Sequence, residues 1–348
     1  MKLLILTQKV DKEDSYFAFF HDWLIRFSRE CEQVIVISLE VGAYDLPHNV
    51  RVISLGKEQG RSRFKYITQL FYALTKYRNE YDAVFAHMSP WYAILSFPWV
   101  KLFNKKLALW YVHRSVDFKL RAAHVLVDKV FTATPESFRI PSRKVEYMGQ
   151  SVPLDRFARQ LNLIQVKPSP MRIGIIGRIT PIKNIEVLIK ALGMLPHEIN
   201  AELHIIGAPV AEGDLQYQNT LKSLAASLGV QEKIQWRGPV KNANLPQELQ
   251  ALHASVNLCP PGGLDKAVLE SMAARVPVVI GNTAFKKYFV GYEEHIVEHT
   301  NAQMVTREIA WIWNGGKQVE GYVDSLYDTV FKLSNLDSMI RTIISKLT

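Results

Sequence analysis

The sequence predicts an α/β protein built from two doubly wound domains in tandem. Three observations lead to this fold class. The chain has 348 residues, a length typical of two domains that each bury a sizeable core. Short apolar runs alternate with longer helical patterns, as in βαβ units with parallel sheets. This alternation lapses once, over Pro153–Pro170, and then starts again.

The first series contains apolar runs without strict alternation, which indicates strands buried on both faces of a sheet. Between them lie stretches with helical periodicity. The expected strands are Leu3–Leu6, Val34–Ser38, Val50–Ser54, Ala83–His87, Leu107–Val112, Val130–Thr132 and Val145–Met148. The expected helices are Phe17–Glu30, Arg63–Tyr77, Trp91–Leu102 and Phe118–Leu126.

The second series opens at Arg172 and repeats the same alternation. Its expected strands are Arg172–Gly177, Glu202–Ile206, Ile234–Trp236, Ser255–Leu258 and Val278–Ile280, and its expected helices are Ile185–Leu192, Tyr217–Leu228, Gln247–His253 and Lys266–Ala274. We therefore expect a first domain over 1–158, a linker over 159–170 and a second domain over 171–348. One or two terminal helices within Tyr322–Leu347 are expected to pack back on the first domain. A ligand would lie at the carboxyl ends of the parallel strands.

Composition excludes several classes of protein. The apolar fraction of 48% and charged fraction of 22% are ordinary for a globular chain. The apolar start of the chain is too short for a signal peptide, and Trp91–Val100 is too short to cross a bilayer. Cys31 and Cys259 are far apart, which favours two buried thiols in a reducing cytoplasm.

The positive charge is unevenly distributed. Residues 51–150 carry 17 Lys and Arg against 7 Asp and Glu, whereas residues 151–348 carry 20 against 18. The first half therefore faces something anionic or presents a solvated basic face. Nucleic acid, a phospholipid surface and a phosphorylated acceptor are the alternatives for a partner.

The loop Gly177–Asn184 has the features of an anion site. A buried strand ends at Gly177, and Asn184 is the expected N-cap of the next helix. Arg178 and Lys183 lie beside that helix N-terminus, where backbone N–H groups and the helix dipole favour an anion. A forked guanidinium and an ammonium suit a diphosphate. The alternative is a surface loop with two cations.

A second candidate site is the helix that follows Pro260–Gly263. Lys266 and Glu270 are four residues apart and share one helical face. A structural ion pair is the simplest interpretation. However, a lysine in the first turn opposes the helix dipole, and an anionic ligand there would remove the conflict. Glycines at the turn let backbone N–H groups approach a phosphate closely.

Together these segments resemble the retaining, GT-B-fold glycosyltransferases of family 4, also called group 1. The family's Gly-Arg-x-x-x-x-Lys loop is matched by Gly177, Arg178 and Lys183, and its Glu-Ala-Met-Ala-x-x-x-Pro-Val-Val segment by Glu270–Val279. Weaker likeness at strand ends and near the linker extends the match over most of 130–282.

The resemblance implies two Rossmann-like domains facing each other across a cleft and a nucleotide-diphosphate sugar as donor. Arg178 and Lys183 would neutralise the leaving diphosphate, and Glu270 would bind the ribose. The remaining donor-binding positions implied by the resemblance are Gly177, Gly238, Val240, Gly263, Leu264, Asp265 and Lys266. No cofactor and no metal are expected, and retention follows from the resemblance alone.

Two departures from the family pattern concern carboxylate and glycine positions. The first Glu of the family's Glu-x7-Glu pattern falls on Gly262, so its usual contact with the donor sugar is missing. Asp265 or Lys266 could replace part of it. The glycine-rich turn after the first strand is also missing, because Thr7–Asp14 stands there.

Three histidines are candidates in the first domain. His113 follows an apolar strand where many relatives place a histidine facing the donor sugar, so it is the preferred catalytic candidate for positioning the sugar or handling the acceptor proton. His87, which ends another strand, and His21, on a helix face, are weaker candidates for the acceptor side. Each has a purely structural role as its alternative.

The expected function is sugar transfer from a nucleotide-diphosphate sugar to a saccharide, lipid-linked or other small acceptor in the cytoplasm. The patches Arg61–Tyr66 and Lys101–Lys106 suggest peripheral contact with the inner face of a membrane, and cell-envelope polysaccharide as a setting. A sugar-nucleotide epimerase or hydrolase, or a non-catalytic nucleotide-sugar-binding protein, is the alternative. An oxidoreductase ranks lower because no Gly-x-Gly-x-x-Gly follows either first strand. A nucleic-acid partner is not expected.

Overall fold

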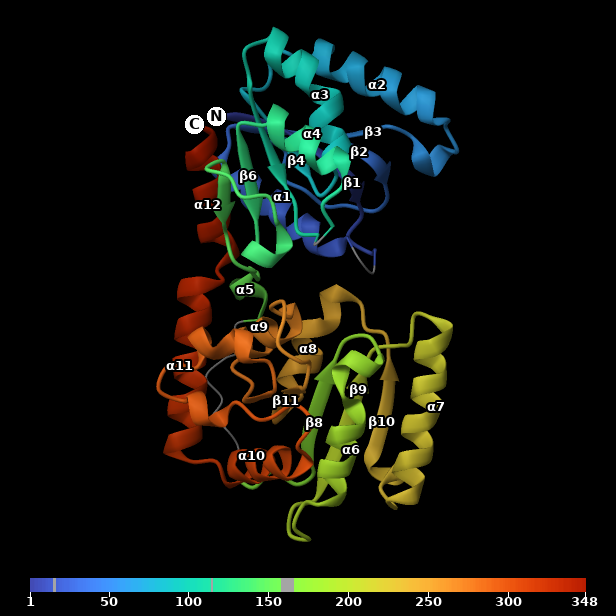
Figure 1. Ribbon diagram of the computed structural model, residues 1–348, viewed down its shortest axis with the longest axis vertical. Coiled ribbons are helices and arrows are strands. Elements are labelled where there is room, and N and C mark those ends of the chain that lie inside the picture. The colour runs from blue at the N-terminus through green and yellow to red at the C-terminus, as the bar shows by residue number, and fades with distance from the viewer. Residues whose placement is uncertain (15–16, 114, 158–165) are drawn as a thin grey trace. The chain divides into compact units, whose positions relative to one another are not determined.

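The computed structural model describes residues 1–14, 17–113, 115–157 and 166–348 (Figure 1). The chain divides into two compact units. The first contains Met1–Ser151 and Leu336–Thr348, and the second contains Val152–Asn335. Most of the expected linker, 159–165, lies outside the described residues, whereas 152–157 belong to the second unit.

The first unit is a seven-stranded parallel sheet in the order β3-β2-β1-β4-β5-β6-β7. Its strands are β1 (Lys2–Val10), β2 (Gln33–Val41), β3 (Val50–Ser54), β4 (Ala83–His87), β5 (Lys106–Trp110), β6 (Lys129–Thr132) and β7 (Val145–Tyr147). Each expected strand is present, and β1 runs four residues past its expected end at Leu6. Successive side chains alternate between two apolar layers: Leu3 and Ile5 face one, Leu4 and Leu6 the other.

Helices cover both faces of this sheet. They are α1 (Ala18–Glu30), α2 (Arg63–Lys76), α3 (Pro90–Leu102), α4 (Phe118–Leu126) and α12 (Leu336–Leu347). Helix α12 comes from the far end of the chain and packs against α1. Its apolar residues Leu336, Met339, Ile340, Ile343 and Ile344 recur at helical spacing and are buried. Burying each contributes on the order of 2 kcal/mol.

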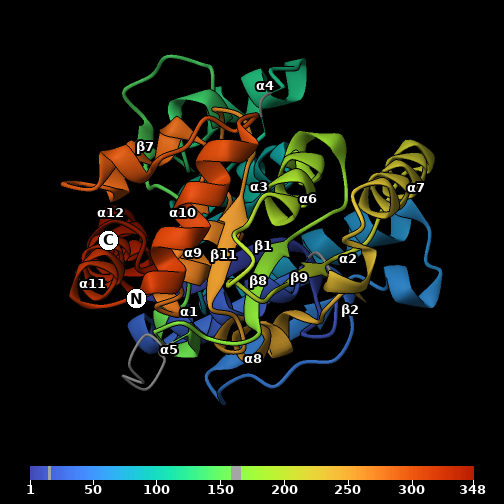
Figure 2. The same ribbon diagram turned by 90° about the horizontal axis from the view of Figure 1, so that it is seen from below.

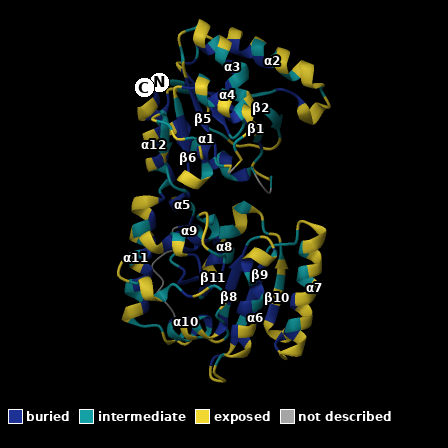
Figure 3. Cartoon of the chain, in the orientation of Figure 1, coloured by how far each residue is buried: buried dark blue, intermediate teal, exposed yellow. Residues whose placement is uncertain are grey.

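The second unit is a five-stranded parallel sheet in the order β10-β9-β8-β11-β12. Its strands are β8 (Met171–Ile176), β9 (Ala201–Ile206), β10 (Ile234–Gly238), β11 (Ala254–Asn257) and β12 (Val278–Ile280). Its helices are α5 (Leu154–Phe157), α6 (Ile185–Gly193), α7 (Glu212–Ser227), α8 (Leu245–Gln250), α9 (Lys266–Ala273), α10 (Ala302–Asn314) and α11 (Lys317–Leu333). Strands β8, β9, β11 and β12 are almost wholly buried, as Figure 3 shows for β8, whereas the edge strand β10 has exposed residues at Gln235 and Arg237.

Besides the four-residue α5, the helix that was not expected from the sequence is α10. It packs against α6, and both are seen beside the sheet in Figure 2. Its buried residues Val305, Ile309 and Ile312 follow helical spacing, and Asn301 caps its first turn by accepting from the Met304 N–H at 3.0 Å. Trp311, Trp313 and Asn314 obscure that periodicity at its end. The predicted fold class, two parallel α/β domains, is confirmed.

Candidate functional site

Three glycines stand in a row at the carboxyl edge of the second sheet. Gly177 follows β8, Gly207 follows β9 and Gly238 ends β10. Their φ angles are 130°, 148° and 71°, a region that favours glycine. The Gly177 N–H donates to the Ile206 carbonyl at 3.0 Å, and the Gly207 N–H donates to the Gly238 carbonyl at 2.8 Å. This edge therefore exposes backbone without side chains.

Gly207 has no room for any side chain. A Cβ placed there would lie 1.8 Å from the Gly177 carbonyl oxygen, well inside van der Waals contact. At Gly177 a Cβ would instead meet Lys183 Nζ at 2.9 Å. Because Gly177 has no side chain, there is room beside it for the ammonium group of Lys183.

Lys183 ends a single turn of 3-10 helix, Pro181–Lys183, and only 8% of it is exposed. Its Nζ lies 2.5 Å from Asp265 Oδ2. A buried ammonium requires a partner of opposite charge, because desolvation of an unpaired charge costs several kcal/mol. The sequence-predicted residues Gly177, Lys183 and Asp265 are therefore brought together, although they are up to 88 positions apart.

Asp265 joins three elements. Its Oδ1 accepts from the Ala267 N–H at 3.1 Å and so caps α9, while its Oδ2 also accepts from Asn257 Nδ2 at 2.9 Å. Burial by itself opposes the charge of this carboxyl, but the Lys183 ammonium and the hydrogen bonds hold its pKa below the ordinary value. Asp265 is therefore an anion in the folded protein.

The start of α6 differs from the sequence expectation. Asn184 precedes α6, but its side chain caps nothing in that helix; it adopts φ 49°, and its Nδ2 donates to the Leu258 carbonyl at 2.8 Å. Tyr217 acts in its place, since its hydroxyl accepts from the Ile185 N–H at 3.0 Å and donates to Glu186. Asn184 is thus the N-cap residue as expected, but its side chain makes no capping hydrogen bond, because it is bonded to Leu258 instead.

Arg178 is exposed at this edge, one residue after Gly177. Asp214, at the start of α7, has a pKa lowered chiefly by a hydrogen bond from Thr180 and to a lesser degree by Arg178. The guanidinium is thus near enough to influence α7, and it stays accessible to solvent.

The side chain of Asn282 binds the turn that precedes α9. The buried Asn282 side chain donates to the Gly263 carbonyl at 3.1 Å and accepts from the Gly262 N–H at 3.4 Å. Lys266 and Glu270 follow on one face of α9, both half-buried. Leu264 and Val240 are half-buried against an apolar cluster beside the turn. The turn is therefore fixed in shape before any ligand arrives.

Residues 164–323 match the family model for glycosyl transferases group 1. The second unit is a group 1 glycosyltransferase domain. This confirms the resemblance carried by Gly177, Arg178, Lys183 and Glu270–Val279. The protein is a glycosyltransferase, and the chemistry of such a domain is sugar transfer from a nucleotide sugar.

Solved structures extend the comparison to the whole chain. HepE from Anabaena in complex with UDP has a TM-score of 0.71 and 15% identity, covering 100% of this chain and 99% of its own. A glycosyltransferase from Rickettsia africae has a TM-score of 0.69 and 16% identity, covering 99% and 98%. The lipopolysaccharide outer core galactosyltransferase WaaB has a TM-score of 0.62 and 11% identity, covering 99% and 100%. These similarities establish the GT-B fold. No curated protein matches the sequence.

The three candidate histidines of this glycosyltransferase lie in different surroundings. His113 is exposed just after β5, with its ring edge-on to Tyr111 at 5.4 Å. His21 is half-buried, its Nε2 accepts from the Asp45 N–H at 3.1 Å, and burial lowers its pKa. Of the three, His113 has the ring most open to a ligand.

His87 belongs to the core of the first unit. It is fully buried, its ring stacks on Phe20 at 3.8 Å, and its Nδ1 lies 3.0 Å from Thr7 Oγ1. The structure thus corrects the expected acceptor-side role: the side chain has no surface on which an acceptor could bind. The helix α1 aromatics that cover it could not be inferred from the strand that His87 ends.

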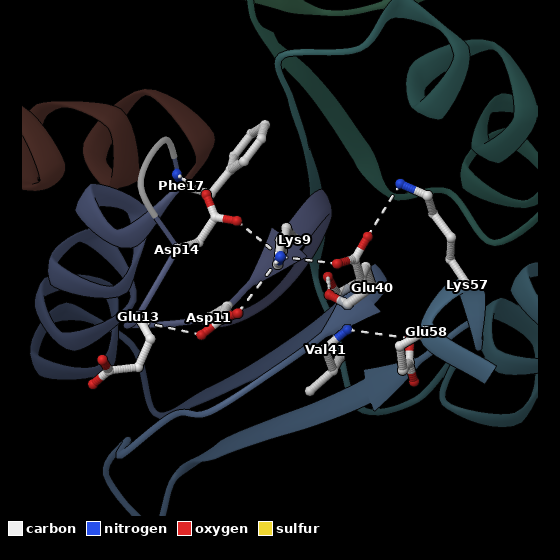
Figure 4. A network of polar contacts seen from close by, with 10 residues as sticks. Lys9, Asp11, Glu13, Asp14, Phe17, Glu40, Val41, Lys57 and Glu58 are labelled. Carbon is white, nitrogen blue, oxygen red and sulfur yellow. Dashed lines mark hydrogen bonds and ion pairs between the residues drawn. The ribbon is translucent and has the colours of Figure 1, made fainter. Parts of the chain in front are cut away.

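The glycosyltransferase replaces the glycine-rich turn after its first strand by an ion network (Figure 4). Lys9 Nζ lies 2.8 Å from Asp14, 2.8 Å from Glu40 and 3.5 Å from Asp11. Glu40 also pairs with Lys57 at 3.1 Å. Hydrogen bonds to Asp14 and Glu40 raise the pKa of Lys9, and the lysines lower that of Glu40. Charged groups on β1, β2 and the following loops therefore tie this edge together.

Four residues that shape this edge of the second unit were not predicted from the sequence: Gly207, Tyr217, Asn257 and Asn282. Gly207 carries the same signal as Gly177, a glycine directly after a buried strand. Asn257 ends β11 and Asn282 follows β12 by two residues, so polar residues at strand ends were the available signal. Tyr217 gave no such signal, because its role depends on how α7 packs on α6.

The thiols and candidate metal ligands add little to the site. Cys31 is buried, which raises its pKa to about 12, and Cys259 is half-buried, also with a raised pKa. Both are free thiols. Within the described residues, no three His, Cys, Asp or Glu side chains are grouped so as to hold a metal ion.

Proposed function

We propose that the enzyme binds a nucleotide-diphosphate sugar at the carboxyl edge of β8–β12 and transfers the sugar to a saccharide or lipid-linked acceptor. The observation that carries this proposal is the Lys183 ammonium, buried beside Gly177 at an edge lined by three glycines. A buried cation at such an edge suits a phosphate, because electrostatic interactions are stronger where water is excluded.

In this proposal Lys183 and Arg178 contact the diphosphate from different sides. Lys183 contacts the diphosphate from within the domain, and Arg178 contacts it from the solvent side, so that together they stabilise the charge that develops on the leaving group. Transfer then proceeds with retention and without a resident metal. In this proposal no carboxylate of the protein acts as a nucleophile, and no covalent intermediate forms between the sugar and the enzyme.

The nucleoside would lie along the glycine row and the start of α9. Gly238 and Val240 border the base, Gly263 and Leu264 lie at the turn, and Glu270 accepts hydrogen bonds from the two ribose hydroxyls. Lys266 approaches the phosphates from the first turn of α9, where an anionic ligand offsets its conflict with the helix dipole. His113 positions the donor sugar or handles the acceptor proton.

A donor screen tests this proposal. Thermal unfolding is measured with UDP-, GDP-, ADP- and dTDP-sugars, and UDP comes first because HepE is solved with UDP. A donor should raise the unfolding midpoint and be consumed when an acceptor extract is added. Product analysis with labelled donor then separates transfer from its competitors: free epimer or free sugar indicates an epimerase or hydrolase, and stabilisation without turnover indicates a binding protein.

We also propose that the first unit contacts an anionic membrane surface through α2, with the enzyme on the cytoplasmic side. A groove of about 870 Å³ runs between α2 and α3. Its lining is mostly apolar and includes the cations Lys57, Arg61 and Arg63. The apolar lining residues are Leu39, Leu55, Tyr66, Ile67, Leu70, Trp91, Tyr92 and Leu95. Neither α2 nor α3 contains an Asp or Glu.

Exposed aromatic side chains accompany these cations. Phe64 is 76% exposed and Tyr72 is 63% exposed on α2. The second basic patch, Lys101–Lys106, is less suited to lipid. Lys106 Nζ donates to the Thr348 carbonyl, and Lys144 Nζ, which lines a separate groove with Lys106, donates to three carbonyls at the end of α4. In the described part of the chain, no helix is both long and apolar enough to cross a bilayer.

Vesicle sedimentation tests the membrane proposal. The enzyme should bind phosphatidylglycerol vesicles more strongly than phosphatidylcholine vesicles, and less at high salt. The double variant Arg63→Glu with Phe64→Ser should lose that binding. The control is Phe331→Ser with Lys332→Glu on α11, an exposed aromatic residue followed by an exposed cation in the second unit. Equal binding by both variants would contradict the proposal.

A further inference from the structure

The carboxylate of Asp265 occupies the position that the proposed donor site would use for an anion. It caps the N-terminus of α9, and its other oxygen lies 2.5 Å from Lys183 Nζ. A helix N-terminus and a buried ammonium are both attractive to a phosphate oxygen. Here both are already in contact with an anion of the protein itself.

The local sequence makes this arrangement specific to Asp265. It is the one acidic residue between Cys259 and Leu269. Asn257 donates to the same oxygen as Lys183, at 2.9 Å, and Asn257 is itself buried. The carboxylate is thus held toward Lys183 by its neighbours on β11 and α9.

We infer that Asp265 is a specificity-determining residue of the donor site, whose charge competes with the diphosphate for Lys183. The inference rests on the proposed function, in which Lys183 contacts the diphosphate. With Asp265 in place, the pair carries no net charge and the attraction for a free nucleoside diphosphate is reduced. The carboxylate also favours departure of the nucleoside diphosphate after transfer, because it re-forms the pair with Lys183.

An Asp265→Asn variant isolates the charge from the shape. Asparagine caps helices as well as aspartate does, so the bond to the Ala267 N–H is kept. What is lost is the negative charge beside Lys183. Asp117 offers a matched control, because it caps α4 in the same way, accepting from the Leu120 N–H at 2.9 Å, with Lys119 nearby.

Titration calorimetry with UDP and with inorganic pyrophosphate is the test. Pyrophosphate reports on the phosphate position without dependence on the base. We expect Asp265→Asn to bind both probes about tenfold more tightly than the unaltered enzyme, from the loss of a like charge close to the phosphates. Salt should weaken its binding more steeply. Asp117→Asn should bind as the unaltered enzyme does.

A double-mutant cycle with Lys183→Ala shows whether the gain operates through the lysine. The tenfold gain should disappear in the Lys183→Ala background. Asp265→Ser, which also caps helices but has no charge, gives a second measurement if Asp265→Asn unfolds at a lower temperature.

The outcomes separate the inference from the proposed function. If the unaltered enzyme binds a probe, Lys183→Ala weakens it, and both Asp265 variants bind equally or more weakly, the inference is overturned and the donor site stands. If neither UDP, GDP, ADP, dTDP nor pyrophosphate binds to the unaltered enzyme or to the Asp265 variants, both the donor site and the inference fail.

Discussion

The carboxyl edges of the two parallel sheets are built in opposite ways. In the second unit the strands β8, β9 and β10 lead into glycines with positive φ, and one buried lysine stands among them. In the first unit β1 continues to Val10, and side chains of Lys9, Asp11, Asp14 and Glu40 fill the corresponding edge.

The difference shows two uses of charge at the same place in a fold. Around Lys9 the ion pairs are partly exposed and join β1, β2 and the loops that follow them. Around Lys183 a single pair joins a buried ammonium to a half-buried carboxylate, and the glycine row leaves backbone uncovered next to it. The first arrangement closes an edge with protein contacts, and the second leaves an edge that a ligand can complete.

The largest effect is expected on catalysis, when the buried cation of the second unit is removed. Lys183→Ala should lower kcat/KM for the donor by on the order of 10²–10³, the cost of removing a fixed charge from a developing anion. Lys190→Ala, an exposed lysine on α6, is the matched control and should leave the rate unchanged. Steady-state kinetics with the donor found in the screen gives both values, and a Lys183→Ala rate near that of Lys190→Ala would refute the phosphate contact.

The next effect concerns the glycine row. Gly207→Ala places a Cβ 1.8 Å from the Gly177 carbonyl oxygen and should lower the free energy of unfolding of the second unit by about 3 kcal/mol or more. Gly60→Ala in the first unit is the comparison. Gly60 also has a positive φ, 69°, but open space around it, so about 1 kcal/mol is expected. Urea unfolding measures both, and equal losses would show that backbone conformation alone matters.

The smallest effect is expected at the ion network. Lys9→Met removes the cation between Asp11, Asp14 and Glu40 and should lower the free energy of unfolding by about 1 kcal/mol at pH 7. Lys12→Met, an exposed lysine in the same loop, should cost less.

The pH dependence sharpens the Lys9 prediction. The pKa of Glu40 is lowered in the folded protein from an ordinary value of 4.5, so its contribution is present above that value and is lost as the pH falls through the folded value. The unaltered protein should therefore lose stability below about pH 4.5, and the gap to Lys9→Met should narrow there. A gap that stays constant between pH 7 and pH 3.5 would contradict an electrostatic origin.

Much of the fold was predictable because its signals are local. Buried parallel strands read as apolar runs, and the glycine after β8 marks a turn that only glycine adopts. The helices α6 and α9 were expected within one or two residues of their observed ends. Helix α10 was missed because its periodicity is blurred by tryptophans that pack at its edge.

The site was predictable only in part. Gly177, Arg178 and Lys183 follow one another along the chain, so their proximity follows from the strand and loop alone. The neighbour of Lys183 does not. Asp265 was an expected donor-binding position, but its pairing with the lysine depends on β8 and β11 being adjacent strands. His87 was misjudged for the same reason, since α1 covers the strand that it ends.

The sequence by itself determined the two-domain α/β class, the strands and most helices, and the cations expected at an anion site, because each follows from periodicity, capping or a short motif. The tertiary structure decided which charges meet. Lys183 faces Asp265 and Lys9 faces Asp14 and Glu40 because parallel strand order brings distant loops to one edge. How far each ion pair is desolvated then determines whether its edge of the sheet is closed by protein contacts or stays open to a ligand.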